Sequence, residues 1–152
     1  MTPKLLFRRV AIAEAITWAL LLIGMFLKYV TETTELGVRI FGMVHGVVFI
    51  AYGLIALATW INQKWSLRTG LMALVSAIPP FATILFDRSA EAAGQLEGPW
   101  RFSAGGEAPA SLPERVLAWL TRNPALAAVV GIVAVAGLTG VALFVGPPAS
   151  GS

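Results

Sequence analysis

The chain has no cysteine, a single histidine and little charge. The absence of cysteine excludes disulfides, thiolate metal sites and cysteine nucleophiles. Charged residues make up 12% of the 152 residues, whereas about a quarter is usual in a soluble domain. So little charge cannot cover a compact soluble surface, which excludes disorder, an ordinary soluble enzyme domain and a nucleic-acid-binding module. With 57% hydrophobic residues, the sequence instead predicts an all-α integral membrane protein.

Four apolar stretches are candidate membrane spans: residues 10–27, 38–61, 70–86 and 125–146. A helix needs roughly 20 apolar residues to cross the hydrocarbon core. The first, second and fourth stretches meet that length, while the third is shorter and contains Pro79-Pro80. We predict four transmembrane helices, with a re-entrant third segment that folds back at Pro79-Pro80 as the rarer alternative.

The segment before the last span is more polar and contains a helix signal. Ser111 and Glu114 are spaced as a capping box. The residues that follow place Trp119 among other apolar side chains, with Arg115 and Arg122 beside them. This pattern predicts a short amphipathic helix on the membrane surface.

These stretches divide the chain into four parts. We expect a three-helix membrane domain over residues 1–88 and a polar loop with the amphipathic helix over residues 89–124. A fourth transmembrane helix follows over residues 125–146, and a disordered tail over residues 147–152.

The positive charges bear on the orientation of the chain. With four crossings, the eleven Lys and Arg residues divide almost evenly, five on the side of the N-terminus and six on the other. With a re-entrant third segment, nine lie on the side of the N-terminus and only Lys28 and Arg39 lie on the other. The first helix alone, which follows Lys4, Arg8 and Arg9, favours a cytoplasmic N-terminus.

Glu14, Arg39 and His45 are the ionisable residues inside predicted spans, where such groups are costly and are candidates for function. We predict that they form the polar core of the helix bundle. One interpretation pairs Glu14 at the membrane interface with Arg8, Arg9 or Arg39. The other makes Glu14 a buried, proton-binding carboxylate.

His45 lies between Gly42 and Gly46, a G-x-x-x-G pattern that lets two helices approach closely. On this face we expect an interhelical hydrogen bond from His45 to Glu14 or Thr17. A proton relay with Glu14 and contact with a haem or quinone are the alternatives. A lone histidine makes a poor metal site, so we expect no metal and no cofactor.

Small residues in the last span also indicate close helix packing. They are Ala127, Gly131, Ala136 and Gly140. At the end of the third span, Asp87-Arg88 is expected to cap the helix and to pair locally. The sequence offers no nucleophile–base pair, phosphate loop or carboxylate pair, and we therefore expect that the protein is not an enzyme.

An ordered series of short motifs covers residues 8–88. They are Arg8-Arg9-Val-Ala-Ile-Ala-Glu14, Leu27-Lys28-Tyr29, Gly42-Met-Val-His45-Gly46, Lys64-Trp65-Ser66, Ile78-Pro79 and Phe86-Asp87-Arg88. This series resembles a bacterial integral-membrane family, common in actinobacteria, with a three-helix domain of uncharacterised function and a His-Gly dipeptide. The resemblance implies that Glu14, Lys28, His45, Gly46, Pro79, Asp87 and Arg88 form the family signature. It implies a small membrane protein or module and supplies no activity.

A second pattern, Ala11-x-x-Glu14 in a first helix, is similar to that of the small multidrug resistance transporters. In that family a membrane carboxylate exchanges protons for cationic drugs. The chain departs from it in its long polar loop, in Arg39 and His45, and in the lack of an aromatic lining in its last span.

The sequence therefore predicts a multi-pass protein of the bacterial inner membrane that acts as an accessory or structural subunit of a larger complex. Its expected partners are the lipid bilayer and other membrane subunits or a second copy of the chain, and not nucleic acid. The alternative is a small proton-coupled transporter with Glu14 as the proton carrier.

Overall fold

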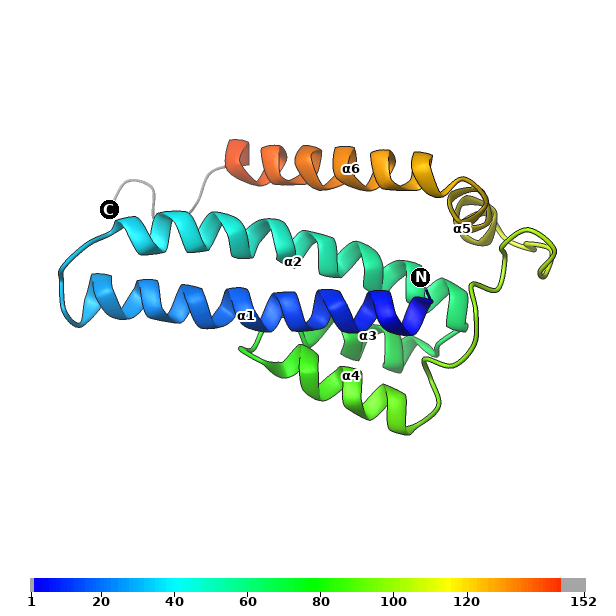
Figure 1. Ribbon diagram of the computed structural model, residues 1–152, viewed down its shortest axis with the longest axis horizontal. Helices are drawn as coiled ribbons and strands as arrows, with labels where there is room; N and C mark the ends of the chain where they lie inside the picture. The colour runs from blue at the N-terminus through cyan, green and yellow to red at the C-terminus, as the bar shows by residue number, and fades with distance from the viewer. Residues whose placement is uncertain (1, 146–152) are drawn as a thin grey trace.

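The computed structural model describes residues 2–145, which form six helices and no strand (Figure 1). The helices are α1 (Pro3–Tyr29), α2 (Leu36–Gln63), α3 (Leu67–Val75), α4 (Ala82–Ala92), α5 (Leu112–Arg122) and α6 (Pro124–Val145). The expected tail at residues 147–152 and the last residue of the span 125–146 lie outside the described residues.

Three helices are long and apolar enough to cross a membrane: α1, α2 and α6. Thr2 begins α1 several residues before the apolar run, because its Oγ1 accepts a hydrogen bond from the amide of Leu5 at 3.2 Å. α1 and α2 lie side by side and antiparallel, joined by a short turn (Figure 1). The predictions of the first, second and last spans are confirmed as helices of spanning length.

The third predicted span is not one helix. The structure has two short helices there, α3 with 9 residues and α4 with 11. At about 1.5 Å per residue, neither reaches the roughly 30 Å of a hydrocarbon core. Pro79 and Pro80 have no amide N–H to continue the helix of α3, and Phe81 then takes a left-handed conformation with φ 67°. The prediction of a fourth crossing at residues 70–86 is therefore corrected to two short helices.

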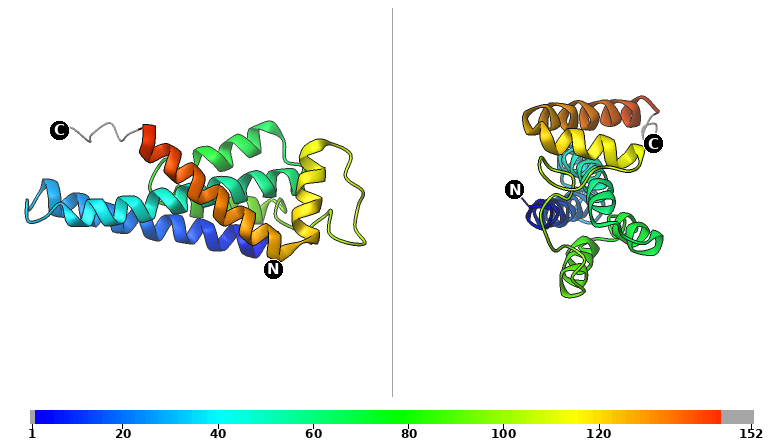
Figure 2. Two further views of the ribbon diagram at one scale, coloured as in Figure 1. Left: turned by 90° about the horizontal axis from the view of Figure 1, so that it is seen from above. Right: turned by 90° about the vertical axis from the view of Figure 1, so that its right-hand side faces the viewer.

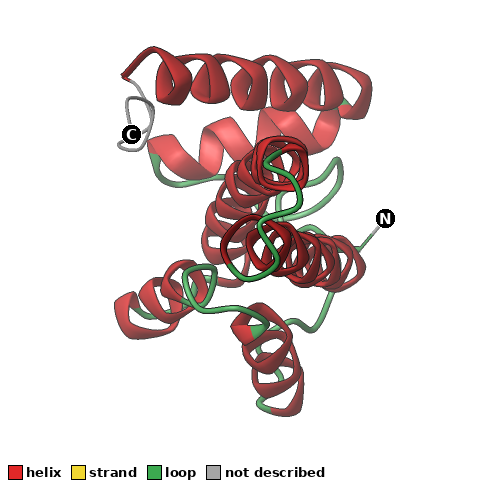
Figure 3. Ribbon diagram, turned by 90° about the vertical axis from the view of Figure 1, so that its left-hand side faces the viewer, coloured by secondary structure: helices red, strands yellow, loops and turns green. Residues whose placement is uncertain are grey.

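α3 and α4 form a hairpin that returns to the end of the molecule from which it starts (Figures 1 and 3). Hydrogen bonds join the segments at its two ends. The Trp65 indole N–H donates to the Gln95 backbone carbonyl at 2.8 Å, and the side-chain amide of Gln63 donates to the Glu97 backbone carbonyl at 3.1 Å. The N-terminus and α5 lie at this same end, which we call the N-terminal end. This backbone geometry agrees with the re-entrant alternative and not with a single crossing helix.

An aromatic core holds the hairpin against the long helices. Phe7 of α1 is fully buried, with its ring centroid 5.5 Å from Tyr52 of α2, 6.0 Å from Trp65 and 5.7 Å from Phe86 of α4. Small residues, including Ala73 of α3, fill the space between these rings. This core brings all four helices of residues 3–92 together at the N-terminal end.

The closest approach of α1 to α2 is at Gly24 and Gly37. A Cβ on Gly24 would lie 2.8 Å from the backbone carbon of Gly37. By contrast, a Cβ on Gly42 would meet only a leucine methyl at 3.8 Å, and one on Gly46 would have nothing within 4 Å. The expectation that Gly42 and Gly46 allow the close contact is therefore wrong, because the helices cross nearer to their connecting turn.

α5 and α6 lie on the opposite side of the α1–α2 pair from the hairpin (Figure 2). The capping box is present: Ser111 Oγ accepts from the Glu114 amide at 3.3 Å, and the Glu114 carboxylate accepts from the Ala110 amide at 2.8 Å. α5 packs Leu117 and Ala118 against Phe102, so the predicted amphipathic helix is confirmed.

α6 runs along α2 but buries none of its residues. Its expected packing residues Ala127, Gly131, Ala136 and Gly140 are half-buried or exposed. A Cβ on Gly131 or on Gly140 would have nothing within 4 Å. Within the described chain, these small residues are therefore not used for close packing.

The Gly24–Gly37 contact predicts the effect of two matched substitutions. Gly24→Ala should lower the free energy of unfolding by about 1–3 kcal/mol, because the new methyl meets backbone atoms that cannot move aside. Gly46→Ala, in open space, should leave stability unchanged or raise it by at most about 1 kcal/mol. Unfolding of both variants in the same detergent measures this, and equal stability of the two would refute the assigned contact.

Candidate functional site

Four polar side chains meet in the interior between α1, α2 and α4. We call Glu14, Thr17, His45 and Thr83 the polar cluster. Glu14 is 0% exposed, Thr83 is fully buried, and Thr17 and His45 are nearly so. The cluster lies where α4 of the hairpin packs on α1 beside α2, and the neighbouring turns of α1 and α2 are otherwise apolar. Ionisable groups in such a place are candidates for function.

His45 lies between Thr17 and Glu14. Its Nδ1 is 2.9 Å from Thr17 Oγ1, and its Nε2 is 3.9 Å from Glu14 Oε1. The Thr17 hydroxyl donates to the backbone carbonyl of Glu14 at 2.9 Å. With its one proton used there, this hydroxyl accepts from Nδ1–H, which leaves Nε2 facing the carboxyl group. The sequence predicted that His45 would meet Glu14 or Thr17, and the structure has both contacts.

The two oxygens of Glu14 have different surroundings. Thr83 Oγ1 lies 2.9 Å from the Ala11 carbonyl and 3.4 Å from Glu14 Oε2, and donates to one or the other. Glu14 Oε1 is buried with no hydrogen-bond partner, and Nε2 of His45 lies 3.9 Å from it. An unpaired carboxylate oxygen in this position is costly unless a proton lies between the two groups.

Side chains of α1 and α2 bind the carbonyls that the break in the hairpin leaves free. The Trp18 indole N–H donates to the Ala77 carbonyl at 3.2 Å. The Tyr52 hydroxyl donates to the Ala73 carbonyl at 2.8 Å and lies 2.9 Å from Ser76 Oγ. In a bilayer no water pairs such groups, so the protein must supply the partners. These two side chains hold the hairpin tip against α1 and α2.

Charged residues join α1 to α4 at the N-terminal end. Arg8 Nε donates to Asp87 Oδ2 at 3.1 Å, Arg8 also contacts Glu91, and Lys4 lies 2.9 Å from Glu91. The expected local pairing of Asp87-Arg88 is therefore wrong: α4 continues to Ala92, and Asp87 is nearly buried against α1, while Arg88 is exposed. Asp87 Oδ1 is buried without a hydrogen-bond partner.

Arg39 does not belong to the polar cluster. It lies in the first turn of α2, its side chain is 77% exposed, and it pairs with Glu35 at 3.7 Å. The expectation that Arg39 joins Glu14 and His45 in the polar core is corrected, because the first turn of α2 lies beside the α1–α2 turn, away from the cluster. The interfacial pairing of Glu14 with an arginine is also not seen among the described residues, since Arg8 contacts α4.

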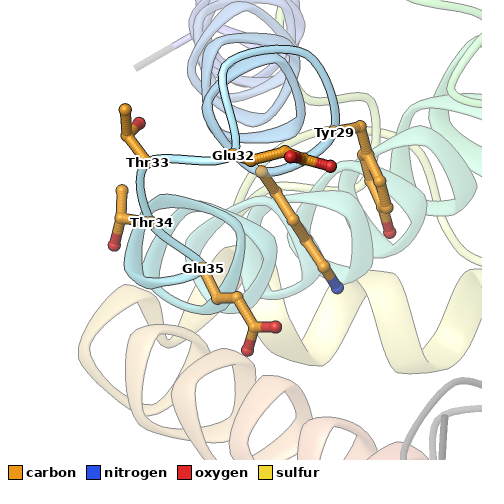
Figure 4. Close-up of a pocket in the computed structure, with 6 residues that line it drawn as sticks. Tyr29, Glu32, Thr33, Thr34 and Glu35 are labelled. Atoms are coloured by element: carbon orange, nitrogen blue, oxygen red, sulfur yellow. The ribbon is translucent and has the colours of Figure 1, made fainter.

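Two further signature residues lie at the hairpin tip and at the end of α1. Pro79 is at the hairpin tip and is exposed. Lys28 lies over the ring of Tyr29 at 5.0 Å, beside an open hollow at the α1–α2 turn that includes Glu32 and Glu35 (Figure 4). A second open hollow lies between the end of α2 and the loop at residues 97–107. Neither hollow reaches the polar cluster.

Sequence reasoning missed three residues of this site: Trp18, Tyr52 and Thr83. Thr83 had a signal, because it precedes Asp87 by four residues and Glu91 by eight, which is one face of a helix. That signal was hidden by the assumption of one continuous span through Pro79. Nothing in the sequence marked Trp18 and Tyr52 as partners of the hairpin backbone.

Comparison with known proteins gives relatives but no activity. The family model described as a domain of unknown function (DUF3817) matches residues 5–92, more than half of the chain. A protein of Streptomyces coelicolor named as a putative membrane protein is 52% identical over 101 residues. That match covers 64% of this chain but only 12% of the Streptomyces protein.

A second relative is an uncharacterized membrane protein of Bacillus subtilis, 39% identical over 69 residues. The match covers 45% of this chain and 71% of the Bacillus protein. No solved structure matches the chain significantly. The matched region of the family model ends at the last residue of α4, so α5 and α6 lie outside it.

The bond from Trp18 to the hairpin predicts a stability difference between two tryptophan variants. Trp18→Phe keeps an aromatic ring beside His45 but leaves the buried Ala77 carbonyl unpaired, which should cost about 1–3 kcal/mol. Trp119→Phe, at an exposed position of α5, should change stability by less than about 0.5 kcal/mol. Unfolding free energies in one detergent compare them, and an equally stable Trp18→Phe variant would contradict the assigned role.

Proposed function

The chain belongs to the DUF3817 family, a family of domains of unknown function, and from this we propose that it is a non-catalytic accessory subunit of a larger bacterial membrane assembly. Helices α1 to α4, which we call the hairpin domain, would provide a rigid platform. α6 would provide the surface to which other membrane proteins bind. The observation that carries the proposal is the contrast between these two parts.

The polar groups of the hairpin domain are used to fix its own backbone. Trp18 and Tyr52 bind carbonyls at the hairpin tip, and Thr83 lies at hydrogen-bonding distance from the Ala11 carbonyl. Arg8 and Asp87 join α1 to α4. Such a set of bonds stabilises one arrangement of helices and supports a structural role.

α6 has the opposite character. It is uncharged over Pro124–Val145 and buries no residue against the rest of the described chain. Ala136 and Gly140, four residues apart and exposed, give it an outward face on which another helix can pack closely. The far greater length of the Streptomyces relative shows that a segment similar to this chain also occurs within a larger protein, which is consistent with a module that works beside further domains.

The fold also favours one orientation. If α1, α2 and α6 cross the membrane and the hairpin does not, nine of the eleven Lys and Arg residues lie at the N-terminal end. Lys28 and Arg39 are the two at the other end. The positive-inside rule then places the N-terminal end in the cytoplasm, in the inner membrane of a bacterium.

Site-specific crosslinking in native membranes tests the accessory role. A photoreactive residue at Gly140 of α6, which is exposed and where a side chain has open space, should give an adduct of one discrete mass. The same residue at Ile16, exposed on α1, is the matched control and should give no discrete adduct. An adduct of twice 16.1 kDa would identify a second copy as the partner, and any other discrete mass would identify a different subunit.

The accessory role fails if neither position gives a discrete adduct, or if both give the same one. Purification as a single monomeric species in gentle detergent would add to that contradiction.

The second candidate function is a proton-coupled transporter, and it is favoured by one observation: Glu14 is buried beside His45. Against it, the two described hollows are open and lie away from the cluster, where no organic substrate would contact Glu14. Uptake of ethidium by vesicles under a pH gradient, abolished by Glu14→Gln, would establish this function. Uptake that is absent or equal in both proteins would exclude it.

A further inference from the structure

We propose that Glu14 and His45 form an intramembrane pair that binds one proton and exchanges it with the N-terminal end of the membrane only, along the interface of α1 and α4. This inference goes beyond the accessory role and does not depend on it. It rests on three features. They are the contact of the two groups, a row of polar residues on one face of α4, and the lack of polar side chains between the pair and the α1–α2 turn.

The contact of the two groups leaves a place for one proton. Nε2 of His45 faces Glu14 Oε1 at 3.9 Å, and both atoms are in the buried interior. The pair is neutral overall when it holds one proton, either as carboxylic acid with imidazole or as carboxylate with imidazolium. With no proton or with two, it carries a net charge in the membrane interior, which is costly. Transfer within the pair breaks the O–H bond of Glu14 as the N–H bond of His45 forms.

A polar stripe on α4 leads from this pair to the membrane surface. Thr83, Asp87 and Glu91 are spaced by four residues and therefore lie on one face of the helix. Thr83 lies 3.4 Å from Glu14, Asp87 contacts Arg8, and Glu91 contacts Lys4. The exposed fraction of the carboxylate side chains rises along the stripe, from 0% for Glu14 to 5% for Asp87 and 34% for Glu91.

The unpaired Oδ1 of Asp87 is the acceptor midway along the stripe. A proton that leaves Glu14 passes to the Thr83 hydroxyl, which releases its own proton toward Asp87. From Asp87 the proton passes to Glu91 and to bulk water at the N-terminal end. The pair regains a proton by the same steps in reverse, so the exchange needs no other reactant.

The charged and titratable groups of the helices around the pair support exchange of the proton with the N-terminal end. On α1, Arg8 lies on the same side as Asp87; on α2, Tyr52 lies near both Glu14 and Asp87. In α3 the charged residue is Arg68, which is exposed. No charged group of these elements lies beyond His45 until the far ends of α1 and α2 are reached.

The far side of the pair is closed. Trp18, one turn beyond Glu14 on α1, packs on the ring of His45 with a centroid distance of 4.6 Å. Beyond Trp18, α1 carries only apolar residues and glycine from Ala19 to Leu27. The backbones of α1 and α2 then meet at Gly24 and Gly37. A proton has no polar route through this region.

Two spectroscopic measurements on the reconstituted full chain count the protons. His45 is the only histidine, so nitrogen-15 NMR of histidine-labelled protein with a tag free of histidine reports on this ring alone. The infrared carboxylic-acid band that is lost in Glu14→Gln reports on Glu14. We expect that band together with a neutral imidazole at neutral pH. A carboxylate with an imidazolium would also support the one-proton pair, while zero or two protons would overturn it.

The exchange route is tested by the rate at which deuterium replaces the shared proton after transfer to heavy water. Asp87→Asn should slow this replacement by about a hundredfold, the lower end of what a positioned proton-transfer group contributes. Glu35→Gln, a carboxylate at the other end that pairs with Arg39, is the matched control and should leave the rate unchanged.

Because Asp87→Asn also weakens the contact with Arg8, Thr83→Val provides a second test that keeps every ion pair. If Asp87→Asn unfolds, the rate in Thr83→Val decides. An unchanged rate in a folded Asp87→Asn or Thr83→Val protein would overturn the route, and a slowed rate in Glu35→Gln would overturn its direction. None of these outcomes depends on whether α6 binds a partner.

Discussion

The structure depends on one constraint: inside a bilayer, every backbone N–H and C=O group needs a partner within the protein. Pro79 and Pro80 end α3 after 9 residues, so carbonyls at the break lose their helical partners. Trp18 of α1 and Tyr52 of α2 replace those partners at the tip of the hairpin. The two long helices and the hairpin are therefore one unit, because side chains of α1 and α2 pair the hairpin backbone.

The same constraint explains where the polar residues are found. A hairpin that turns back toward its starting end places α4 against α1, and the face of α4 that meets α1 carries Thr83 and Asp87. Glu14 then lies among hydroxyl and imidazole groups and not in lipid. In a fully crossing helix these residues would face other neighbours. The broken helix is thus the reason that the interior contains a connected set of polar groups.

The sequence predicted the parts of the fold that depend on composition and local spacing. Apolar runs located α1, α2 and α6, and the spacing of Ser111 and Glu114 located α5. Contacts between distant segments were less accessible. The close approach at Gly24 and Gly37 depends on where two helices cross, and the pairing of Asp87 with α1 depends on the direction in which α4 returns. An apolar run does not reveal that direction, because both a crossing helix and a hairpin bury apolar side chains.

The central claim, that residues 67–92 enter and leave the membrane on one side, is tested directly by cysteine labelling. The chain has no cysteine, so single substitutions Arg68→Cys, Glu97→Cys and Thr33→Cys can be compared with a maleimide that does not cross membranes. In intact cells and in inverted vesicles, the first two should label from the same side and Thr33→Cys from the opposite side. Labelling of Arg68→Cys and Glu97→Cys from opposite sides would show that this segment crosses the membrane and would contradict the account.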